Sequence, residues 1–322
     1  TNPSQVLEIN QSGANLGISV AMAGDINGDG FSDILAGAHQ YDNGQNNEGA
    51  AFLYYGGAGG AGGSPVALEA NQATAMMGYA VSSAGDLNGD GFSDVLVGAR
   101  LYTNGELYEG AVFVYKGSAA GIVTANPVKI EANQIDARLG HSVATIGDVN
   151  GDGLSDILMG AYQYKQNQTN EGAAFLYFGS SAGPLLGEKR TLYGFQKEGQ
   201  FGFAVAGAGD VNGDGYGDFI IGARYYSITK PNEGAAFLYY GNSTKNFPVR
   251  NAIFSSVQDN AWLGTAVASA GDVNGDGFSD VVIGAYAYDN GQTDEGTALI
   301  YHGGALLGHT AAKNMITDSV YV

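Results

Sequence analysis

The feature that most constrains this chain is a pattern that recurs five times at an almost constant interval. The copies are SVAMAGDINGDGFSDILAGA (19–38), AVSSAGDLNGDGFSDVLVGA (80–99), SVATIGDVNGDGLSDILMGA (142–161), AVAGAGDVNGDGYGDFIIGA (204–223) and AVASAGDVNGDGFSDVVIGA (266–285). The first aspartate of each copy follows the previous one by 61, 62, 62 and 62 residues. Such a period is typical of repeat proteins, in which each unit buries its apolar face against its neighbours.

Each repeat contains the signals of four short β-strands. In the first repeat SVAMAG and DILAGA flank an acidic loop, EGAAFLYYG (48–56) follows a polar loop, and SPVALEA (64–70) closes the unit. No segment has the apolar period or the capping residues of a long helix. The pattern predicts an all-β fold, a β-propeller of five four-stranded blades in one domain over residues 1–322. A solenoid is the alternative, although solenoid repeats usually run to about 20 to 45 residues.

The acidic loop is the most unusual part of the repeat, and it reads GDINGDGFSD in the first copy. Oxygen-bearing side chains fill loop positions 1, 3, 5 and 9, which are Asp25, Asn27, Asp29 and Asp33. Glycine at position 6 permits a sharp turn, and the carbonyl of the residue at position 7 supplies a further oxygen. Carboxylates this close together repel one another, so the loop is expected to hold a cation between them.

The same loop occurs at 25–33, 86–94, 148–156, 210–218 and 272–280. The predicted metal ligands, with position 7 contributing its backbone carbonyl, are Asp25, Asn27, Asp29, Phe31 and Asp33; Asp86, Asn88, Asp90, Phe92 and Asp94; Asp148, Asn150, Asp152, Leu154 and Asp156; Asp210, Asn212, Asp214, Tyr216 and Asp218; and Asp272, Asn274, Asp276, Phe278 and Asp280. Because every donor is a hard oxygen, calcium is favoured over zinc or copper, with about five ions per chain.

Two other interpretations of the loop exist. An EF-hand requires glutamate at position 12, where the five loops carry Ala36, Val97, Met159, Ile221 and Ile283, so that class of site is excluded. The other is a plain Asn-Gly or Asp-Gly turn with solvated aspartates. A turn alone does not require aspartate at positions 1 and 9 in all five copies, so the cation site is favoured.

The repeat resembles the FG-GAP repeat, which forms the propeller blades of integrin α-subunits. The fourth copy carries the nearest match, with Phe201-Gly202 before the strand, DVNGDGYGD in the loop and IIGAR after it. The resemblance extends over essentially the whole chain. It implies one calcium ion per blade on one face, with partner-binding loops on the opposite face.

The sequence also departs from that family in three ways. The proline of GAP is replaced by His39, Arg100, Tyr162, Arg224 and Tyr286. The integrin propeller is a ring of seven blades, whereas the period here leaves room for five. Because the chain has no cysteine and no sign of the remaining integrin domains, the resemblance favours a microbial extracellular relative over an animal receptor.

The two ends of the chain resemble the closing strand of a repeat. SQVLEINQSGANLG (4–17) resembles PVALEANQATAMMG (65–78), and AAKNMITDSVYV (311–322) takes the same place after the fifth repeat. One such strand is redundant, so residues 1–12 and 311–322 are predicted closing or exchange strands. An exchanged strand would pair with the sheet edge of a second copy and build a homo-oligomer or filament. A disordered tail and a fragment of a longer protein are the alternatives.

Two further residue types recur once in each repeat. Tyrosines precede the variable loops, at Tyr41, Tyr102, Tyr164, Tyr226 and Tyr288. They are either packing residues between blades or a surface that binds a protein or glycan. Glutamates precede the third strand, at Glu48, Glu109, Glu171, Glu233 and Glu295. A buried hydrogen bond to loop backbone is their expected role, ahead of a ligand role.

Composition limits the function. Acidic residues outnumber basic ones 32 to 13, and a net charge of -19 argues against a nucleic-acid partner. No apolar run approaches the roughly 18 residues of a membrane span. The N-terminal residues carry no signal-peptide pattern, so any such peptide is expected to have been removed. Without cysteine there is no disulfide or thiolate metal site.

The sequence therefore predicts a calcium-binding module, extracellular or at the cell surface, with a structural or adhesive function and a protein or glycan partner there. Self-assembly through donated terminal strands is one form of that function. A lectin or adhesin that binds glycans through the loops opposite the calcium face is the alternative. No nucleophile elbow, phosphate-binding loop or HExxH motif is present, so an enzyme is not expected, although a propeller channel can hold catalytic carboxylates without a local signature.

Overall fold

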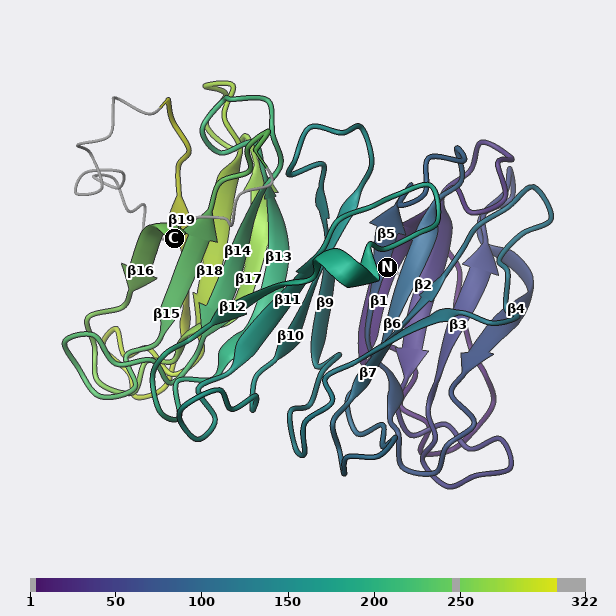
Figure 1. The fold of residues 1–322 in the computed structure, drawn as a ribbon, viewed down its shortest axis with the longest axis horizontal. Helices are drawn as coiled ribbons and strands as arrows, with labels where there is room; N and C mark the ends of the chain where they lie inside the picture. The colour runs from purple at the N-terminus through teal and green to yellow at the C-terminus, as the bar shows by residue number, and fades with distance from the viewer. Residues whose placement is uncertain (1–3, 245–249, 306–322) are drawn as a thin grey trace. The chain divides into compact units, whose positions relative to one another are not determined.

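The computed structural model describes residues 4–244 and 250–305, and regular structure in that part of the chain is almost entirely β-strand (Figure 1). The one described helix is a single 3₁₀ turn, η1, at Leu186–Glu188. The residues form two compact units. The first comprises Thr1–Ala144 with Ser180–Gly183, and the second comprises Thr145–Gly179 with Pro184–Val322.

The first unit contains two antiparallel sheets, in which each strand pairs with the next one along the chain. Blade 1 consists of β1 (Ser19–Gly24), β2 (Asp33–Ala38), β3 (Ala50–Tyr55) and β4 (Gly62–Glu69). Blade 2 consists of β5 (Met77–Gly85), β6 (Asp94–Ala99), β7 (Ala111–Tyr115) and β8 (Val128–Glu131). The acidic loop joins the first and second strands of each blade.

The second unit contains the other three sheets, except that β9 begins in the first unit. Blade 3 consists of β9 (Ser142–Gly147), β10 (Asp156–Ala161), β11 (Ala173–Tyr177) and β12 (Arg190–Tyr193). Blade 4 consists of β13 (Phe201–Gly209), β14 (Asp218–Ala223), β15 (Ala235–Tyr239) and β16 (Arg250–Ser255). The described strands of blade 5 are β17 (Leu263–Gly271), β18 (Asp280–Ala285) and β19 (Thr297–Tyr301).

Four antiparallel strands per repeat are therefore confirmed for blades 1 to 4. In blade 5 three strands are described, and the segment predicted to close it, 311–322, lies outside the described residues. The arrangement of the blades as a closed ring stays a prediction.

Consecutive blades within a unit pack face to face, and this packing explains why the inner strands are apolar throughout. Every residue of β14 and of β15, in the middle blade of the second unit, is buried. In the first unit one core joins Leu53 of blade 1 to Val97 of blade 2. In the second unit another core joins Leu238 of blade 4 to Ile283 of blade 5. A strand that is covered on both faces carries a continuous apolar run instead of an alternating one.

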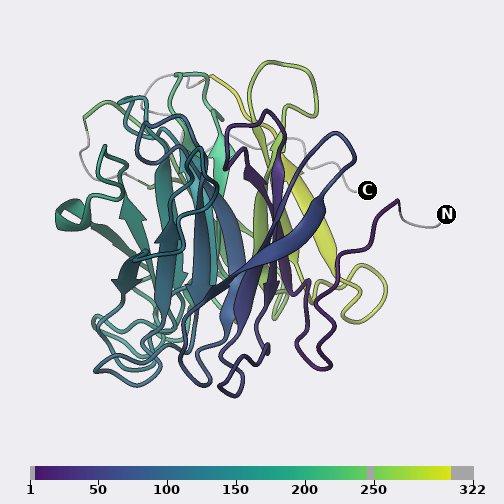
Figure 2. The same ribbon diagram turned by 90° about the vertical axis from the view of Figure 1, so that its right-hand side faces the viewer.

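Residues 4–17 contain no strand and lie against blade 1 (Figure 2, purple). The Ala61 N–H donates to Gln5 Oε1 at 3.1 Å, and Gln5 Nε2 donates in return to the Ala61 carbonyl. Leu7 packs against a core cluster formed by β2 and β3. The described part of the predicted exchange strand 1–12 is thus docked on its own chain, and its exchange between copies stays a prediction.

In blades 1, 2, 4 and 5, a glutamine in the segment that precedes the first strand binds the loop that follows the second strand. Gln72 Nε2 donates to the Thr103 carbonyl at 2.7 Å, and the Thr103 N–H donates to Gln72 Oε1 at 2.7 Å. The same reciprocal pair joins Gln11 to Asp42, Gln196 to Ser227 and Gln258 to Asp289. A side-chain amide offers one donor and one acceptor, as a backbone peptide does, so each link is held in register with its blade.

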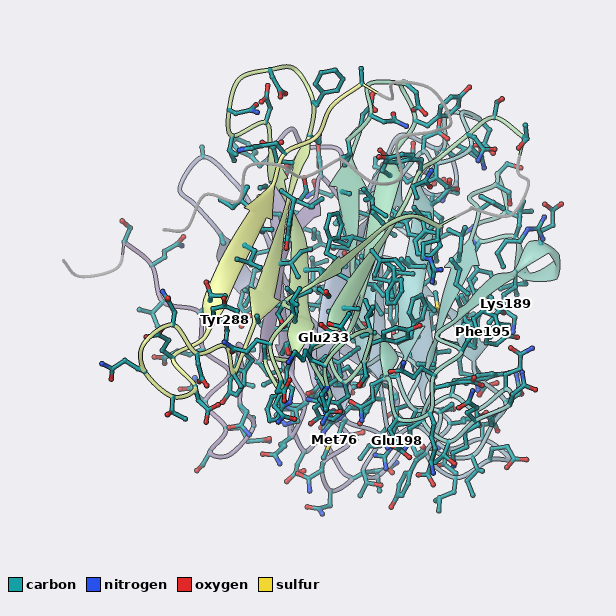
Figure 3. The ribbon with its side chains drawn as sticks, turned by 90° about the vertical axis from the view of Figure 1, so that its left-hand side faces the viewer. Met76, Lys189, Phe195, Glu198, Glu233 and Tyr288 are labelled. Carbon is teal, nitrogen blue, oxygen red and sulfur yellow. The ribbon has the colours of Figure 1, made fainter. Side chains whose placement is uncertain are left out.

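The recurrent glutamates hold the loops that precede the third strands. Glu48, Glu109, Glu171 and Glu233 are fully buried, at 0% exposure. Glu109 Oε1 accepts the Asn104 N–H at 2.7 Å, and its Oε2 accepts the Asn133 N–H at 3.0 Å. Loop N–H groups reach Glu48 and Glu233, the latter labelled in Figure 3, at 2.6 Å. The Asn167 N–H donates to Glu171 Oε1 at 2.7 Å, so the prediction that these glutamates bond loop backbone is confirmed for these four.

Replacing Glu109 with alanine should lower the free energy of unfolding by about 2 to 4 kcal/mol, because two loop N–H groups lose their hydrogen bonds to a buried carboxylate. Guanidinium chloride unfolding followed by circular dichroism measures the change. Glu295→Ala is the matched control, since Glu295 occupies the same repeat position in blade 5 but is exposed. Equal losses in the two variants would contradict the assignment of the buried hydrogen bonds as the cause.

Candidate metal centres

Each acidic loop is folded around the carboxylate at its first position. In the first loop Asp25 Oδ1 accepts the N–H groups of Gly28 at 2.7 Å and Asp29 at 3.1 Å, and Oδ2 accepts that of Gly30 at 2.9 Å. The positive φ angles of Gly28, +73°, and Gly30, +88°, allow the backbone to turn this tightly. The same three bonds surround Asp86, Asp148, Asp210 and Asp272.

Positions 1 and 3 present their oxygens to one shared donor. The Asp29 N–H lies 3.1 Å from Asp25 Oδ1 and 3.0 Å from Asn27 Oδ1. The other four loops repeat this arrangement, with distances of 2.9 to 3.1 Å. The side chain of position 5 contacts that of position 3, since Asn27 Nδ2 donates to Asp29 Oδ2 at 2.9 Å. The loop therefore gathers three of the four side chains that the sequence predicted as ligands, those of positions 1, 3 and 5.

Position 9 differs from the other three because its carboxylate is fully buried. Asp33, Asp94, Asp156, Asp218 and Asp280 are each 0% exposed. Asp156 Oδ2 accepts the Val149 N–H at 2.9 Å, and its Oδ1 accepts the Gly179 N–H at 2.8 Å. Val149 belongs to the acidic loop and Gly179 lies beyond the third strand, so this carboxylate ties the two together. The sequence predicted position 9 as a ligand but not as this tie.

Burial of position 9 has an electrostatic cost. Burial, together with the charges of the aspartates at positions 1 and 5 of the same loops, raises the pKa of Asp94, Asp156 and Asp218 to about 7, although two backbone N–H groups act to lower it. Asp33 shifts in the same direction, also through burial. Burial acts likewise on Asp280, but the Gly303 and Val273 N–H groups and the His302 imidazole together hold the pKa of that carboxyl below its usual value.

The chemistry of the loops fits a hard cation. The side chains at positions 1, 3, 5 and 9 offer oxygen donors, and no histidine or cysteine lies within any of the loops. Within the described residues, however, no group of three or more acidic or histidine side chains has the spacing of a metal site. The carboxylates instead accept the N–H groups of their own loop. The ligand assignment therefore stays a prediction.

The recurrent tyrosines lie at the opposite end of each sheet from the acidic loops, because the second strand separates the two. Their rings pack edge-on against phenylalanines of the third strand, at centroid distances of 5.0 Å for Tyr41 and Phe52 and 5.4 Å for Tyr164 and Phe175. Tyr102 and Tyr226 make the same contact, and Tyr288 (Figure 3) packs against the core of blades 4 and 5. This packing gives the tyrosines a structural role, and partner binding by them stays a prediction.

The fold and the loops define a class of protein: an all-β repeat protein in which every sheet carries one acidic loop at the same hairpin. The chain belongs to the FG-GAP repeat family, whose model matches residues 16–54, 77–115, 139–177, 201–239 and 263–301. Each match spans the first three strands of a blade and the acidic loop. The family predicted from the sequence is thus confirmed.

Similar proteins include α-subunits of integrins. Integrin alpha-PS2 of Drosophila melanogaster is 32% identical over 226 residues, covering 66% of this chain and 15% of the relative. Integrin alpha-7 of Mus musculus is 34% identical over 161 residues, covering 49% of this chain and 13% of the relative. The chain therefore spans less than a fifth of the length of these relatives.

A solved structure, that of the exotype rhamnogalacturonan lyase YesX, aligns with 82% of this chain and 55% of its own chain. The identity is 13% and the TM-score 0.41, and similarity at that level says nothing about activity. In the part of the chain that the structure describes, no helix has the length and hydropathy needed to cross a membrane.

Replacing Asp94 with alanine should destabilise the chain even in a chelator, by about 2 to 4 kcal/mol, because the Leu87 and Gly117 N–H groups lose their acceptor. Asp90→Ala is the matched control, because Asp90 is exposed and accepts one N–H within its own loop. Its loss should cost less than about 1 kcal/mol in the chelator. Chemical unfolding measures both, and equal effects would show that position 9 has no separate structural role.

Proposed function

We propose that this chain is an extracellular adhesive module in which one calcium ion bound to each acidic loop fixes the loop and its blade. The observation that carries the proposal is the shared fold of the loops. In all five, the position-5 N–H bonds both the position-1 carboxylate and the position-3 amide oxygen, so these oxygens face the same region. All five copies of the repeat therefore have one arrangement of these oxygen donors.

Calcium suits this donor set better than other biological cations. It accepts six to eight oxygen ligands in flexible geometry, whereas magnesium demands a near-ideal octahedron and retains several waters. In the first loop the ligands would be the side chains of Asp25, Asn27, Asp29 and Asp33, with the Phe31 carbonyl. A bound ion supplies two positive charges, which offset the repulsion among the three carboxylates of a loop.

An extracellular location is consistent with cation sites in loops of this kind. Millimolar calcium outside cells would fill sites that cytosolic calcium would leave empty. The family relatives are integrin α-subunits, and the strongly acidic chain is a poor match for nucleic acid. The proposal assigns the chain no catalytic residue.

The proposed partner is a protein at the cell surface, bound by the loops opposite the acidic ones. These variable loops are exposed, as residues 42–46 are in blade 1. They differ from repeat to repeat while the strands that carry them do not, which suits recognition on a constant scaffold. A glycan is the alternative partner, but stacking of sugars on the recurrent tyrosines is less favoured because those rings pack against phenylalanines.

Calcium should bind at about five sites per chain and raise the melting temperature. At a free concentration 100-fold above Kd, each site would add about 2.7 kcal/mol of stability. Isothermal titration calorimetry counts the ions, and scanning calorimetry in calcium and in EDTA measures the melting temperature. Asp210→Ala should lower the count by one. No heat of binding at millimolar calcium, with an unchanged melting temperature in EDTA, would refute the calcium assignment.

The adhesive function is tested by applying the labelled chain to one array of extracellular proteins and one of glycans. We expect calcium-dependent binding to a protein that is abolished by EDTA. Replacing residues 42–47 with an alternating Gly-Ser segment is a first variant of a variable loop, to be followed by the equivalent segment of each other blade. At least one replacement should abolish binding while leaving the calcium count unchanged. Binding to glycans alone, or to neither array, would contradict the proposal.

A further inference from the structure

Acidic loops that follow one another within a unit are joined through their backbones. The Ser93 N–H, at position 8 of the second loop, donates to the carbonyl of Asp25, position 1 of the first loop, at 3.0 Å. The same bond joins Gly217 to Asp148 at 2.9 Å and Ser279 to Asp210 at 2.9 Å. In each pair, the residue whose side chain organises one loop is held in place by the backbone of the next.

A second backbone bond reinforces the first. The carbonyl of Ile26, the residue after Asp25, accepts the Ser118 N–H at 3.0 Å, and Ser118 lies just beyond the third strand of blade 2. Equivalently, the Val149 carbonyl accepts the Asn242 N–H at 2.8 Å, and the Val211 carbonyl accepts the Gly304 N–H at 2.9 Å. Two consecutive carbonyls at the start of a loop are therefore both bound by the next blade.

A side chain completes the connection by covering the Asn-Gly step of the preceding loop. A Cβ atom added to Gly28 would lie 2.7 Å from Cε1 of Phe92, which is position 7 of the next loop. The equivalent distances are 2.6 Å between Gly151 and Tyr216 and 2.5 Å between Gly213 and Phe278. Only glycine permits a ring to approach the backbone this closely, so the glycine of Asn-Gly serves this contact as well as the turn.

The fifth loop shows what these contacts accomplish, because no following loop is among the described residues. Val273, the second residue of that loop, is 52% exposed, whereas Ile26 and Val211 at the same position are 0% and 2% exposed. A Cβ atom at Gly275 would meet no atom within 4 Å. The position-7 side chain of the first loop, Phe31, is also exposed, at 43%.

We infer that adjacent cation loops of one unit bind their ions cooperatively, with the position-7 side chain of one loop acting as a positioning residue for the loop before it. This inference rests on the proposed calcium function and adds a mode of regulation to it. An ion that orders the fifth loop fixes Ser279 and Phe278, and these hold the carbonyl of Asp210 and the Gly213 turn in the fourth. The coupled pairs are the first and second loops, the third and fourth, and the fourth and fifth.

Thermodynamic linkage makes the coupling reciprocal for ion binding. Emptying the fifth loop should weaken the fourth, and emptying the fourth should weaken the fifth by the same factor. The position-7 contact is directional, in contrast, because Phe278 covers the fourth loop and no described loop covers the fifth. A change in Phe278 should therefore act more on the fourth loop than on its own.

Hydrogen–deuterium exchange with mass spectrometry of the full chain tests the inference, because each loop lies in a peptide of distinct sequence. Exchange is measured over a calcium titration, and the calcium concentration that half-protects each loop is recorded. Asp272→Ala should raise this midpoint about tenfold for loop 210–218, which corresponds to about 1.4 kcal/mol. The first loop, which is in the other unit, should keep its midpoint.

Phe278→Ala should raise the midpoint of loop 210–218 by a similar factor and leave that of loop 25–33 unchanged. Phe31→Ala is the matched control, because it makes the same change at the same loop position in the first loop, which is in the other unit. Phe278→Leu is a milder variant, since Leu154 occupies that position naturally in the third loop. It keeps the test open should Phe278→Ala unfold.

The expected result is that Asp272→Ala and Phe278→Ala raise the calcium midpoint of the fourth loop and that Phe31→Ala does not. Protection of all five loops by calcium in the native chain, with midpoints that stay independent in every variant, would overturn the coupling and leave the proposed function intact. Absence of calcium protection in the native chain would overturn the proposed function, and the coupling with it.

Discussion

The repeat depends on a carboxylate buried at the start of the second strand of each blade. Asp156 and its equivalents accept one N–H from the acidic loop and one from beyond the third strand. A buried carboxylate with two charge-assisted hydrogen bonds leaves the backbone of the hairpin little freedom. These two hydrogen bonds hold the loop against its own sheet without a bound ion. Its other carboxylates are left near the surface, where a cation can reach them.

The same nine residues consequently serve packing within a blade, packing between blades and the proposed ion binding. Position 9 faces the core, positions 1, 3 and 5 gather around one N–H group, and position 7 covers the neighbouring loop. In this account calcium would act on the stiffness of the scaffold and not on chemistry. The variable loops lie at the other end of the sheets, so the proposed recognition and ion-binding sites are separated by the length of a strand.

Much of this could be predicted from the sequence, because it is encoded locally. The period, the four strands of blades 1 to 4 and the oxygen donors follow from residues within one repeat. The contact of Phe92 with Gly28 could not, because it joins two repeats and position 7 is Phe, Leu or Tyr with no motif of its own. The hydrogen bonds of Gln72 and the structural role of position 9 could not be predicted for a related reason. The sequence shows that a side chain has a carboxylate or an amide, but it does not show which backbone groups that side chain will bond. The glutamates could be predicted because a charged residue repeated before a buried strand must find buried partners.

The most direct test of the calcium assignment is a crystal structure grown in millimolar calcium, with anomalous differences collected at a long wavelength where calcium scatters anomalously. The account predicts a peak in each of the five loops, at 2.3 to 2.6 Å from the side-chain oxygens of positions 1, 3, 5 and 9 and the carbonyl of position 7. Loops that keep their internal N–H contacts and show no peak at that calcium concentration would contradict it.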